Sequence, residues 1–220
     1  MTNSVAATPV PFLDLFNFNL SATQPTQDAE AIEQLSFIPG LKEFLMLRQV
    51  HALEHATVWV LSDASKYSNS GLGTAVVDNE LLSGLSTEEG FFLYGQVNKP
   101  DLQRAVRVAL QRLTNGEFHL AVHPRCGTNV SVAMLLTFGL GLGMYLLLPR
   151  TPIEQMLGWG IAALAAAQLA PELGVLAQRY ITTAIPFNLE IADIKLTQDS
   201  WGRTAYFIQV GWRDSSQASC

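Results

Sequence analysis

The 220-residue sequence has few cysteines and few charged residues. The first shortage argues against a disulfide-stabilised protein, and the second against a nucleic-acid-binding protein. Its two cysteines, Cys126 and Cys220, do not make a disulfide framework, so we expect a reducing compartment. Charged residues make up 15% of the chain, the net charge is −6, and the basic residues form no stripe. We therefore expect no nucleic-acid partner, because such binding depends on basic residues that neutralise phosphates.

Residues 1–27 contain no basic residue, and Asp14, Asn17 and Asn19 interrupt their apolar patch. A secretory signal needs a positively charged start and an uninterrupted apolar core, so we expect none here. The segment is predicted to be a flexible N-terminal tail whose apolar patch docks on the domain or on a membrane surface.

Apolar residues are abundant, at 49% of the chain with a mean hydropathy of +0.21, and their excess lies mainly between Val130 and Ala170. Residues 130–148 carry no charge and would span about 28 Å as a helix, close to the roughly 30 Å of bilayer hydrocarbon. A second apolar run, 156–170, is rich in glycine and alanine, which suits close helix packing in lipid. We predict a transmembrane helical hairpin over 130–178; the alternative is one span plus a re-entrant or buried helix.

A hairpin would leave both flanking parts of this multi-pass protein on one side of the bilayer. Near the predicted spans, Arg125 and Arg179 outnumber Arg150 in the turn, which favours the cytosolic or stromal side. The expected partners are the lipid bilayer and, as a second class, other membrane proteins.

The predicted fold class is α+β with membrane spans. Residues 28–129 should form an α/β soluble domain with a small βαβ unit, and 179–220 a C-terminal β-hairpin and tail that can join its sheet. Helices are expected at 29–37, 41–62 and 101–113, and strands at 73–77, 91–97, 118–122, 189–196 and 204–212, with polar connectors at 63–73 and between the first two strands.

The string His51-Ala52-Leu53-Glu54-His55 interrupts a helix that is apolar nearly all round. Imidazoles four residues apart lie about 6 Å from each other along one helix face, so both can reach one ion. The pattern H-x-x-E-H is also that of inverted zincins, in which the glutamate activates a water. The alternative without a metal is a hydrogen-bonded polar cluster of these residues with Arg48 and Arg125.

A second string, His123-Pro124-Arg125-Cys126-Gly127-Thr128-Asn129, ends where the first apolar run begins. His123 and Cys126 can converge across the Pro-Arg turn, and imidazole and thiolate are the ligands that Zn²⁺ prefers. On a strand, His119 would lie about 13 Å from His123, so His119 is predicted to be a surface or packing residue. The candidate metal ligands are His51, His55, His123 and Cys126.

These two strings ahead of an apolar run resemble those of an uncharacterised family of cyanobacterial and chloroplast-lineage membrane proteins, which implies a membrane such as the thylakoid. The chain is also similar to the broader bacterial YqhQ-like family, which pairs His-Gly-Ala-Glu-His with His-Pro-Arg-Cys-Gly-Thr. The similarity covers roughly residues 40–150, with Ala52 and Asn129 as departures from the pattern. It implies one common site and no particular activity; the residues carried over are His51, Glu54, His55, His123, Arg125 and Cys126.

Three functional hypotheses follow. The first is a membrane-anchored, zinc-dependent hydrolase in which His51, His55 and His123 hold the ion and Cys126 is a thiol beside these ligands. In this hypothesis Glu54 is the general base and Arg125 stabilises an anion. The second is a non-catalytic assembly or interaction factor in which a structural metal, with Cys126 as fourth ligand, or a polar cluster joins the domain to the span. The third is ligation of haem or a pigment by His51 or His55.

Overall fold

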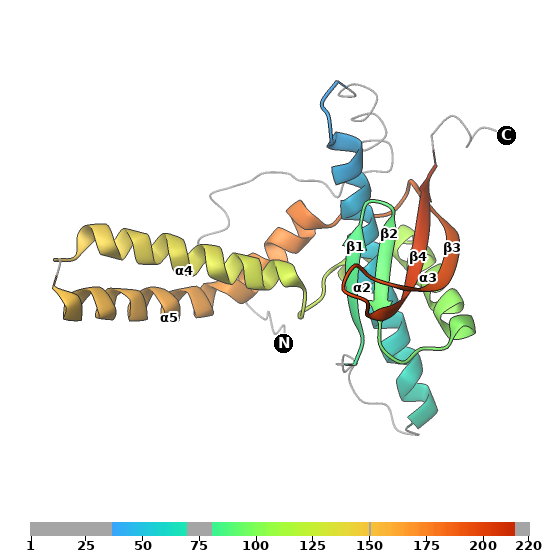
Figure 1. Ribbon diagram of the computed structural model, residues 1–220, viewed down its shortest axis with the longest axis horizontal. Coiled ribbons are helices and arrows are strands. Elements are labelled where there is room, and N and C mark those ends of the chain that lie inside the picture. Colours follow the sequence, from blue (N-terminus) through green and yellow to red (C-terminus); the bar gives the residue numbers. More distant parts are fainter. Residues whose placement is uncertain (1–36, 70–80, 150, 214–220) are drawn as a thin grey trace, which may run out of the picture.

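In a computed structural model, which describes residues 37–69, 81–149 and 151–213, a four-stranded antiparallel sheet organises one half of the described chain (Figure 1). Its strands are β1 (Ser83–Thr87), β2 (Gly90–Tyr94), β3 (Leu189–Gln198) and β4 (Thr204–Trp212), in the spatial order β1-β2-β4-β3. The C-terminal hairpin therefore inserts β4 beside β2, which confirms that it joins the sheet begun before the apolar runs.

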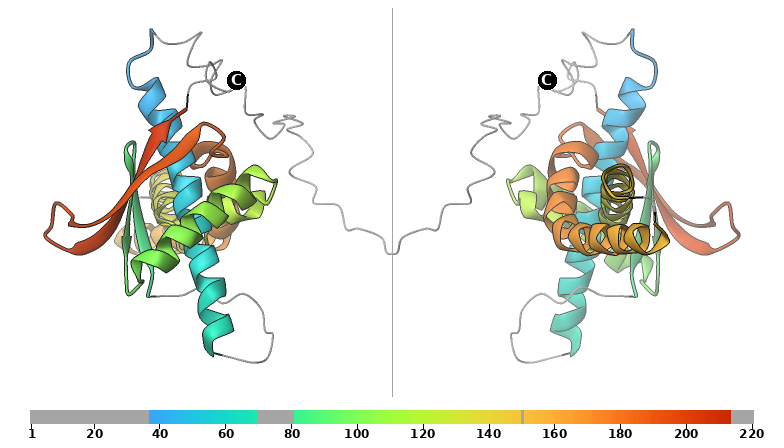
Figure 2. Two further views of the ribbon diagram at one scale, coloured as in Figure 1. Left: turned by 90° about the vertical axis from the view of Figure 1, so that its right-hand side faces the viewer. Right: turned by 90° about the vertical axis from the view of Figure 1, so that its left-hand side faces the viewer.

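Two helices, α2 (Leu41–Asn69) and α3 (Lys99–Thr114), cover one face of this sheet (Figure 2). Alternation along β2 turns Phe91 and Leu93 inward, where both are buried against the helices. The helix α3 begins as its sequence predicts, because Asn98 accepts a hydrogen bond from the Asp101 N–H and Pro100 occupies the first turn. Other members of this core are Val50, Leu53, Leu102, Val106, Leu113 and Ile208.

The helices α4 (Gly127–Leu147) and α5 (Pro152–Ala177) lie side by side and project away from the sheet (Figure 1). This confirms the predicted helical hairpin, with α5 continuing through Pro171. Both helices are long and apolar enough to cross a membrane, with mean hydropathies of 2.0 for Gly127–Leu147 and 1.5 for Pro152–Thr182. Only 6% of the first apolar window is buried, whereas the core helix of a soluble protein would be mostly covered.

Small residues spaced every four positions form the contact face of α5. Their small side chains let the helices approach closely, and the space where a Cβ of Gly141 would lie on α4 is filled by the ring of Trp159. The buried stripe on α5 consists of Gly158, Ala162, Ala166, Ala170 and Gly174.

One expected strand is wrong, and with it the βαβ unit. Residues 118–122 are apolar except for His119, but they form a short 3₁₀ helix, η2 (Phe118–Ala121), instead. Side chains of α2 bind this segment's carbonyls: Ala121 O lies 2.7 Å from His55 Nδ1, and Val122 O accepts from Trp59 Nε1. Because these carbonyls are already bonded, no neighbouring strand is needed to satisfy them.

The polar connector expected before β2 contains a strand. The residues of β1 pair with β2 through a two-residue turn after Thr87, although they show no apolar alternation. The helix α2 also runs to Asn69 rather than ending at Ser62, so the first part of the expected loop at 63–73 is helical.

Several expectations fall outside the described residues: the flexible tail 1–27, the strand 73–77 and nearly all of the helix 29–37. The division of the chain at 28–129, 130–178 and 179–220 stays a prediction.

The α5 stripe gives a test of the hairpin. Ala166→Leu places a larger side chain between the helices, and we expect a loss of about 1–3 kcal/mol in the free energy of unfolding. Ala167→Leu is the matched control, because residue 167 is exposed. Thermal unfolding of both variants in detergent measures the difference; equal effects would show that this face is not packed.

Candidate metal centre

The middle of α2 places three polar side chains at the base of the hairpin. The rings of His51 and His55 lie one helical turn apart, with centroids 4.3 Å from each other. His55 and Glu54 are buried, with 3% and 8% of their surfaces exposed. Buried polar groups need partners, and the segments that flank the hairpin provide them.

Each of the two histidines is held by a backbone carbonyl. His55 Nδ1 lies 2.7 Å from Ala121 O, just before α4, and His51 Nδ1 lies 3.0 Å from Thr182 O, just after α5. A carbonyl oxygen only accepts, so both Nδ1 atoms donate, and in the neutral form of each ring Nε2 keeps its lone pair. Metal-binding histidines are oriented in this way, with the second nitrogen bonded to a carbonyl or carboxylate.

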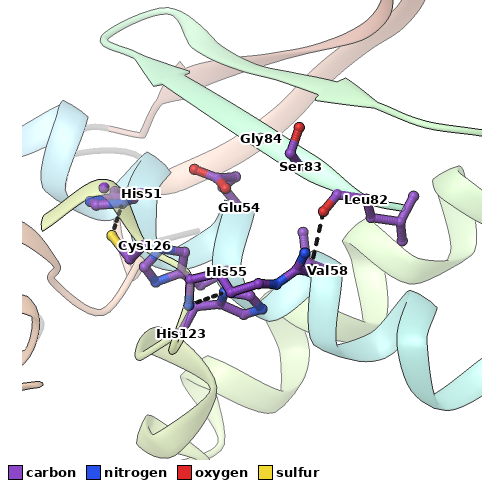
Figure 3. A pocket seen from close by; sticks show the side chains of 11 residues that line it. His51, Glu54, His55, Val58, Leu82, Ser83, Gly84, His123 and Cys126 are labelled. Atoms are coloured by element: carbon purple, nitrogen blue, oxygen red, sulfur yellow. Dashed lines mark hydrogen bonds between the residues drawn. The ribbon is translucent and has the colours of Figure 1, made fainter. Parts of the chain in front are cut away.

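The thiol of Cys126 completes this group. Cys126 is the N-terminal cap of α4, where its Sγ accepts a hydrogen bond from the Thr128 N–H at 3.4 Å. The same Sγ lies 3.3 Å from His51 Nε2 (Figure 3). Ligand atoms of His51, His55 and Cys126 all lie within 4.8 Å of one another, so this His/His/Cys group can hold a metal ion.

The environment of Cys126 favours the thiolate that a metal needs. Burial raises the pKa of the thiol, but a hydrogen bond and positive charge from His55 in its protonated form, together with hydrogen bonds from Thr128, lower the pKa overall. A metal bound at this site would take the place of that proton. The site is therefore suited to a cation.

His123 lies beside this group in a different arrangement. Its ring centroid is 5.6 Å from that of His55 and 5.0 Å from that of Trp59. Its Nδ1 accepts from the Arg125 N–H at 3.3 Å, so this nitrogen is already bonded. The group of ligand atoms that lie within 4.8 Å of one another does not include His123. The role of His123 as a metal ligand stays a prediction.

The loop that carries His123 is tied to the hairpin through Gln178, which is fully buried. The Gln178 side chain accepts from the His123 N–H at 2.8 Å and donates to Asn129 Oδ1 at 2.7 Å. Asn129 in turn donates to Pro124 O at 2.7 Å. Asn129 also fills the space where a Cβ of Gly174 would lie.

The side chain of Glu54 extends from α2 to the edge strand β1. Its Oε2 accepts a hydrogen bond from Ser86 Oγ at 2.8 Å, and its carboxylate fills the space where a Cβ of Gly84 would lie. Burial raises the pKa of Glu54 more than the Ser86 hydrogen bond and the nearby His51 lower it. Gly84 is thus needed for the carboxylate to occupy its present position.

A cavity of about 170 Å³ joins these residues (Figure 3). Arg125, the predicted anion-stabilising residue, lines it and donates to Leu82 O at 3.4 Å. The cavity lining therefore includes all six residues of the predicted site: His51, Glu54, His55, His123, Arg125 and Cys126.

Sequence reasoning missed the residues that orient this site. The carbonyls of Ala121 and Thr182 leave no trace in a side-chain pattern. Gly84 and Ser86 lie in what reads as a polar connector, and Gln178 lies in a run of helix-forming residues. His119 is exposed on η2, so the predicted surface position holds, although the segment is not a strand. Cys220 lies outside the described residues.

The chain belongs to the family described as domain of unknown function DUF6391, whose model matches residues 46–194. It is 48% identical over 192 residues to an uncharacterised protein of the cyanobacterium Picosynechococcus sp. (strain PCC 7002), which covers 87% of this chain and 92% of that relative. No solved structure matches. The expectation of an uncharacterised cyanobacterial family is confirmed, whereas the wider similarity to the YqhQ-like family stays a prediction.

The geometry predicts which single substitutions abolish metal binding. His51→Ala, His55→Ala and Cys126→Ser each remove a ligand atom, so their zinc affinity should fall by more than the roughly 10–100-fold that loss of a supporting hydrogen bond costs. His119→Ala is the control and should keep the metal. Zinc content after dialysis against a competing chelator gives the affinities.

The same measurement on His123→Ala decides between three protein ligands and four. Retained zinc limits the set to His51, His55 and Cys126, whereas loss of zinc restores His123 to it. Wild-type protein that takes up no zinc would show that the cluster is only hydrogen-bonded.

Proposed function

We propose that this chain is an integral membrane protein that binds zinc at the membrane surface through His51, His55 and Cys126 and uses the ion in hydrolysis. The observation that carries the proposal is the pair of carbonyl-held imidazoles, which leaves two Nε2 lone pairs beside a thiol. The family has no described activity, so the support comes from the geometry.

The apolar hairpin supports the membrane location. Exposed large side chains such as Leu135, Phe138 and Leu164 cover α4 and α5, and a bilayer would remove them from water. Since both helices return to the sheet, the site would lie on one side of the bilayer, at its surface. Arg125 and Arg179 near the base favour the cytosolic or stromal side.

The ligand set favours zinc in an open, catalytic site. Two imidazoles and a thiolate suit this borderline-soft ion, and catalytic zinc keeps three protein ligands with a water or substrate in the fourth position. Zinc bound there would supply a water of lowered pKa and would polarise a carbonyl oxygen.

The surrounding residues have roles in such a reaction. Glu54, buried beside the histidines, would take a proton from the attacking water and deliver it to the leaving group as the acyl bond breaks. Arg125 lines the same cavity and would stabilise the negative charge that develops on the acyl oxygen. Water is the only co-reactant that this step requires.

A second candidate follows from the contact between Cys126 and His51. A thiol at a helix N-terminus, 3.3 Å from an imidazole that a carbonyl orients, is also the arrangement of a cysteine nucleophile and its base. In that case the protein would be active without metal. Alkylation by iodoacetamide would then stop the reaction even when a chelator is present.

A structural metal is the remaining alternative, because the same ligands would join α2 to the start of α4. Replacing zinc with cobalt separates these cases. A thiolate-to-cobalt charge-transfer band would report Cys126 as a ligand, and a change in the ligand-field bands on adding azide would report an open position. A closed site would not respond to azide. A Soret band in the purified protein would instead assign haem.

Glu54→Gln tests the catalytic role. The variant should keep its zinc, because Glu54 is not in the ligand group, while its kcat for chromogenic acyl esters should fall about 10²-fold or more. Unchanged kcat in a zinc-loaded variant would remove Glu54 from the mechanism.

Gly84→Ala should reproduce this effect without touching the carboxylate itself. Its added methyl occupies the space of the Glu54 carboxyl, which must then swing away from the cavity. Gly139→Ala is the matched control, because nothing lies within 4 Å of the position of its added Cβ. Kinetics and zinc content of both variants, measured together, give the comparison; equal kinetics would show that the position of the carboxyl does not matter.

A further inference from the structure

The turn between β3 and β4 is built around one buried carboxylate. Asp199 Oδ1 accepts hydrogen bonds from the Trp201 and Arg203 N–H groups at 2.9 and 2.8 Å. Asp199 Oδ2 accepts from the Tyr94 hydroxyl at 2.8 Å and from Arg203 Nε at 2.7 Å. The Asp199 side chain is only 1% exposed, and Gly202 provides the positive φ of 75° at the tip. Because one buried carboxylate binds the turn at several points, the turn has little freedom to change shape.

The rigid turn presents a large apolar ring to the outside. Trp201 is 69% exposed, although its backbone N–H is held by Asp199. The Arg203 guanidinium lies 5.1 Å from the centre of the Trp201 ring and 4.5 Å from that of the Tyr94 ring, so the indole is supported on one side. Fixing a side chain costs conformational entropy, which burial of its exposed surface against a partner offsets. The construction of the turn therefore indicates that a partner covers the indole.

The turn lies on the side of the sheet from which the helical hairpin projects. In Figure 1, α4 and α5 extend to the left, and the β3–β4 turn lies at the left end of these two strands, at about the horizontal position of β1. Residues 84–86 of β1 line a groove together with Gly127 and Thr128, so this position is where α4 begins. Both views in Figure 2 show the turn displaced sideways from the two helices. If the hairpin crosses a bilayer, the turn lies near the bilayer surface, to one side of the spans.

The chemistry of the turn fits the head-group region of a bilayer. Tryptophan and tyrosine are enriched at membrane–water interfaces, because their rings have an apolar body and a polar edge. Arg203 Nε lies 2.7 Å from Asp199 Oδ2, so the charges of this pair offset each other. We therefore expect the indole ring, rather than attraction to anionic lipids, to determine whether the turn contacts the bilayer.

We propose that the β3–β4 turn is a second membrane anchor, in which Trp201 inserts its indole among the lipid head groups and Asp199 holds the ring in position for insertion. This inference rests on the membrane location in the proposed function, and not on zinc or hydrolysis. The hairpin holds the domain at one place, whereas a contact to its side also fixes how the domain tilts over the bilayer. The metal cavity then keeps a constant position relative to the bilayer surface.

Fluorine NMR of the full chain labelled with fluorotryptophan tests this contact. The chain is placed in phosphatidylcholine nanodiscs in which a few lipids carry a doxyl spin label close to the head group. Each signal is assigned by replacing one tryptophan at a time with phenylalanine. We expect the signals of Trp201 and of Trp159, which is 41% exposed on α5, to broaden. The signal of Trp212 should broaden far less, because Trp212 ends β4 roughly 26 Å along the strand from the turn.

Two variants test the role of the carboxylate. Asp199→Asn keeps the shape of the side chain but removes its charge, which weakens the hydrogen bonds that hold the turn. Broadening of the Trp201 signal by the lipid label should fall, and broadening by a soluble gadolinium chelate should rise. Glu190→Gln is the matched control, because it makes the same chemical change at the other end of β3, where the side chain is 55% exposed. Equal behaviour of the two variants would overturn the role of Asp199.

The lipid composition separates insertion of the ring from electrostatic attraction. Adding phosphatidylglycerol to the nanodiscs should leave the broadening of the Trp201 signal unchanged. Broadening that is seen only with this anionic lipid would overturn insertion of the indole. Protection of Trp201 from both the lipid label and the soluble chelate would show that a protein surface covers the ring, and would likewise overturn the lipid contact.

The Trp159 signal separates this inference from the proposed membrane location of the hairpin. Broadening of the Trp159 signal without that of Trp201 would leave the hairpin in the bilayer and overturn the second anchor. Broadening of Trp201 alone would support the lipid contact of the turn and overturn the crossing of the bilayer by the hairpin. If neither signal broadens, both proposals are wrong.

Discussion

Two hydrogen bonds between imidazoles and backbone carbonyls determine how the two halves of this molecule meet. His55 donates to Ala121 O and His51 to Thr182 O, and these carbonyls belong to the segments that enter and leave the hairpin. Both segments depart from regular α-helix, in η2 (Phe118–Ala121) and in the π-helical turn η3 (Gln178–Thr182). Their departure from α-helix puts these carbonyls within reach of α2, because carbonyls inside an α-helix are committed to its own ladder.

The same constraint explains why the polar cluster tolerates burial. The two histidines, Glu54 and Cys126 each have a partner from another element: two carbonyls, Ser86 Oγ and, for Cys126, His51 Nε2. A buried network of this kind fixes one arrangement of its elements, because any displacement leaves a polar group without its partner. The site is thus the contact between sheet, helix and hairpin.

Much of this architecture is readable from the sequence, where the signal is a long regular pattern. The uncharged run 130–148 and the small residues of 156–170 each predicted a helix that the structure contains. The spacing of His51 and His55 predicted that their imidazoles lie together, and they belong to a group that could hold a metal ion. Short segments were less predictable. Residues 118–122 form a short apolar run that resembles a strand, yet a local pattern does not show the donors on α2 that bind their carbonyls.

Other features of the site could not be predicted from the sequence for a different reason. Gly84 matters because a carboxylate from another element occupies the place of its missing Cβ, and Gln178 matters because of partners about 50 residues away. A single sequence carries no record of such three-dimensional contacts. For the His/His/Cys group, the candidate ligands could be predicted from the residue types, but the orientation of their side chains could not.

The position of the hairpin within the chain has a consequence for biosynthesis. The two central strands of the sheet, β2 and β4, pair with each other, and the two apolar helices lie between them in the sequence. On the ribosome, β4 emerges only after α4 and α5 have been synthesised. The sheet that covers α2 and α3 therefore closes last, and such non-local pairing is slow. Until then β2, whose Phe91 and Leu93 are buried in the folded chain, has an open edge.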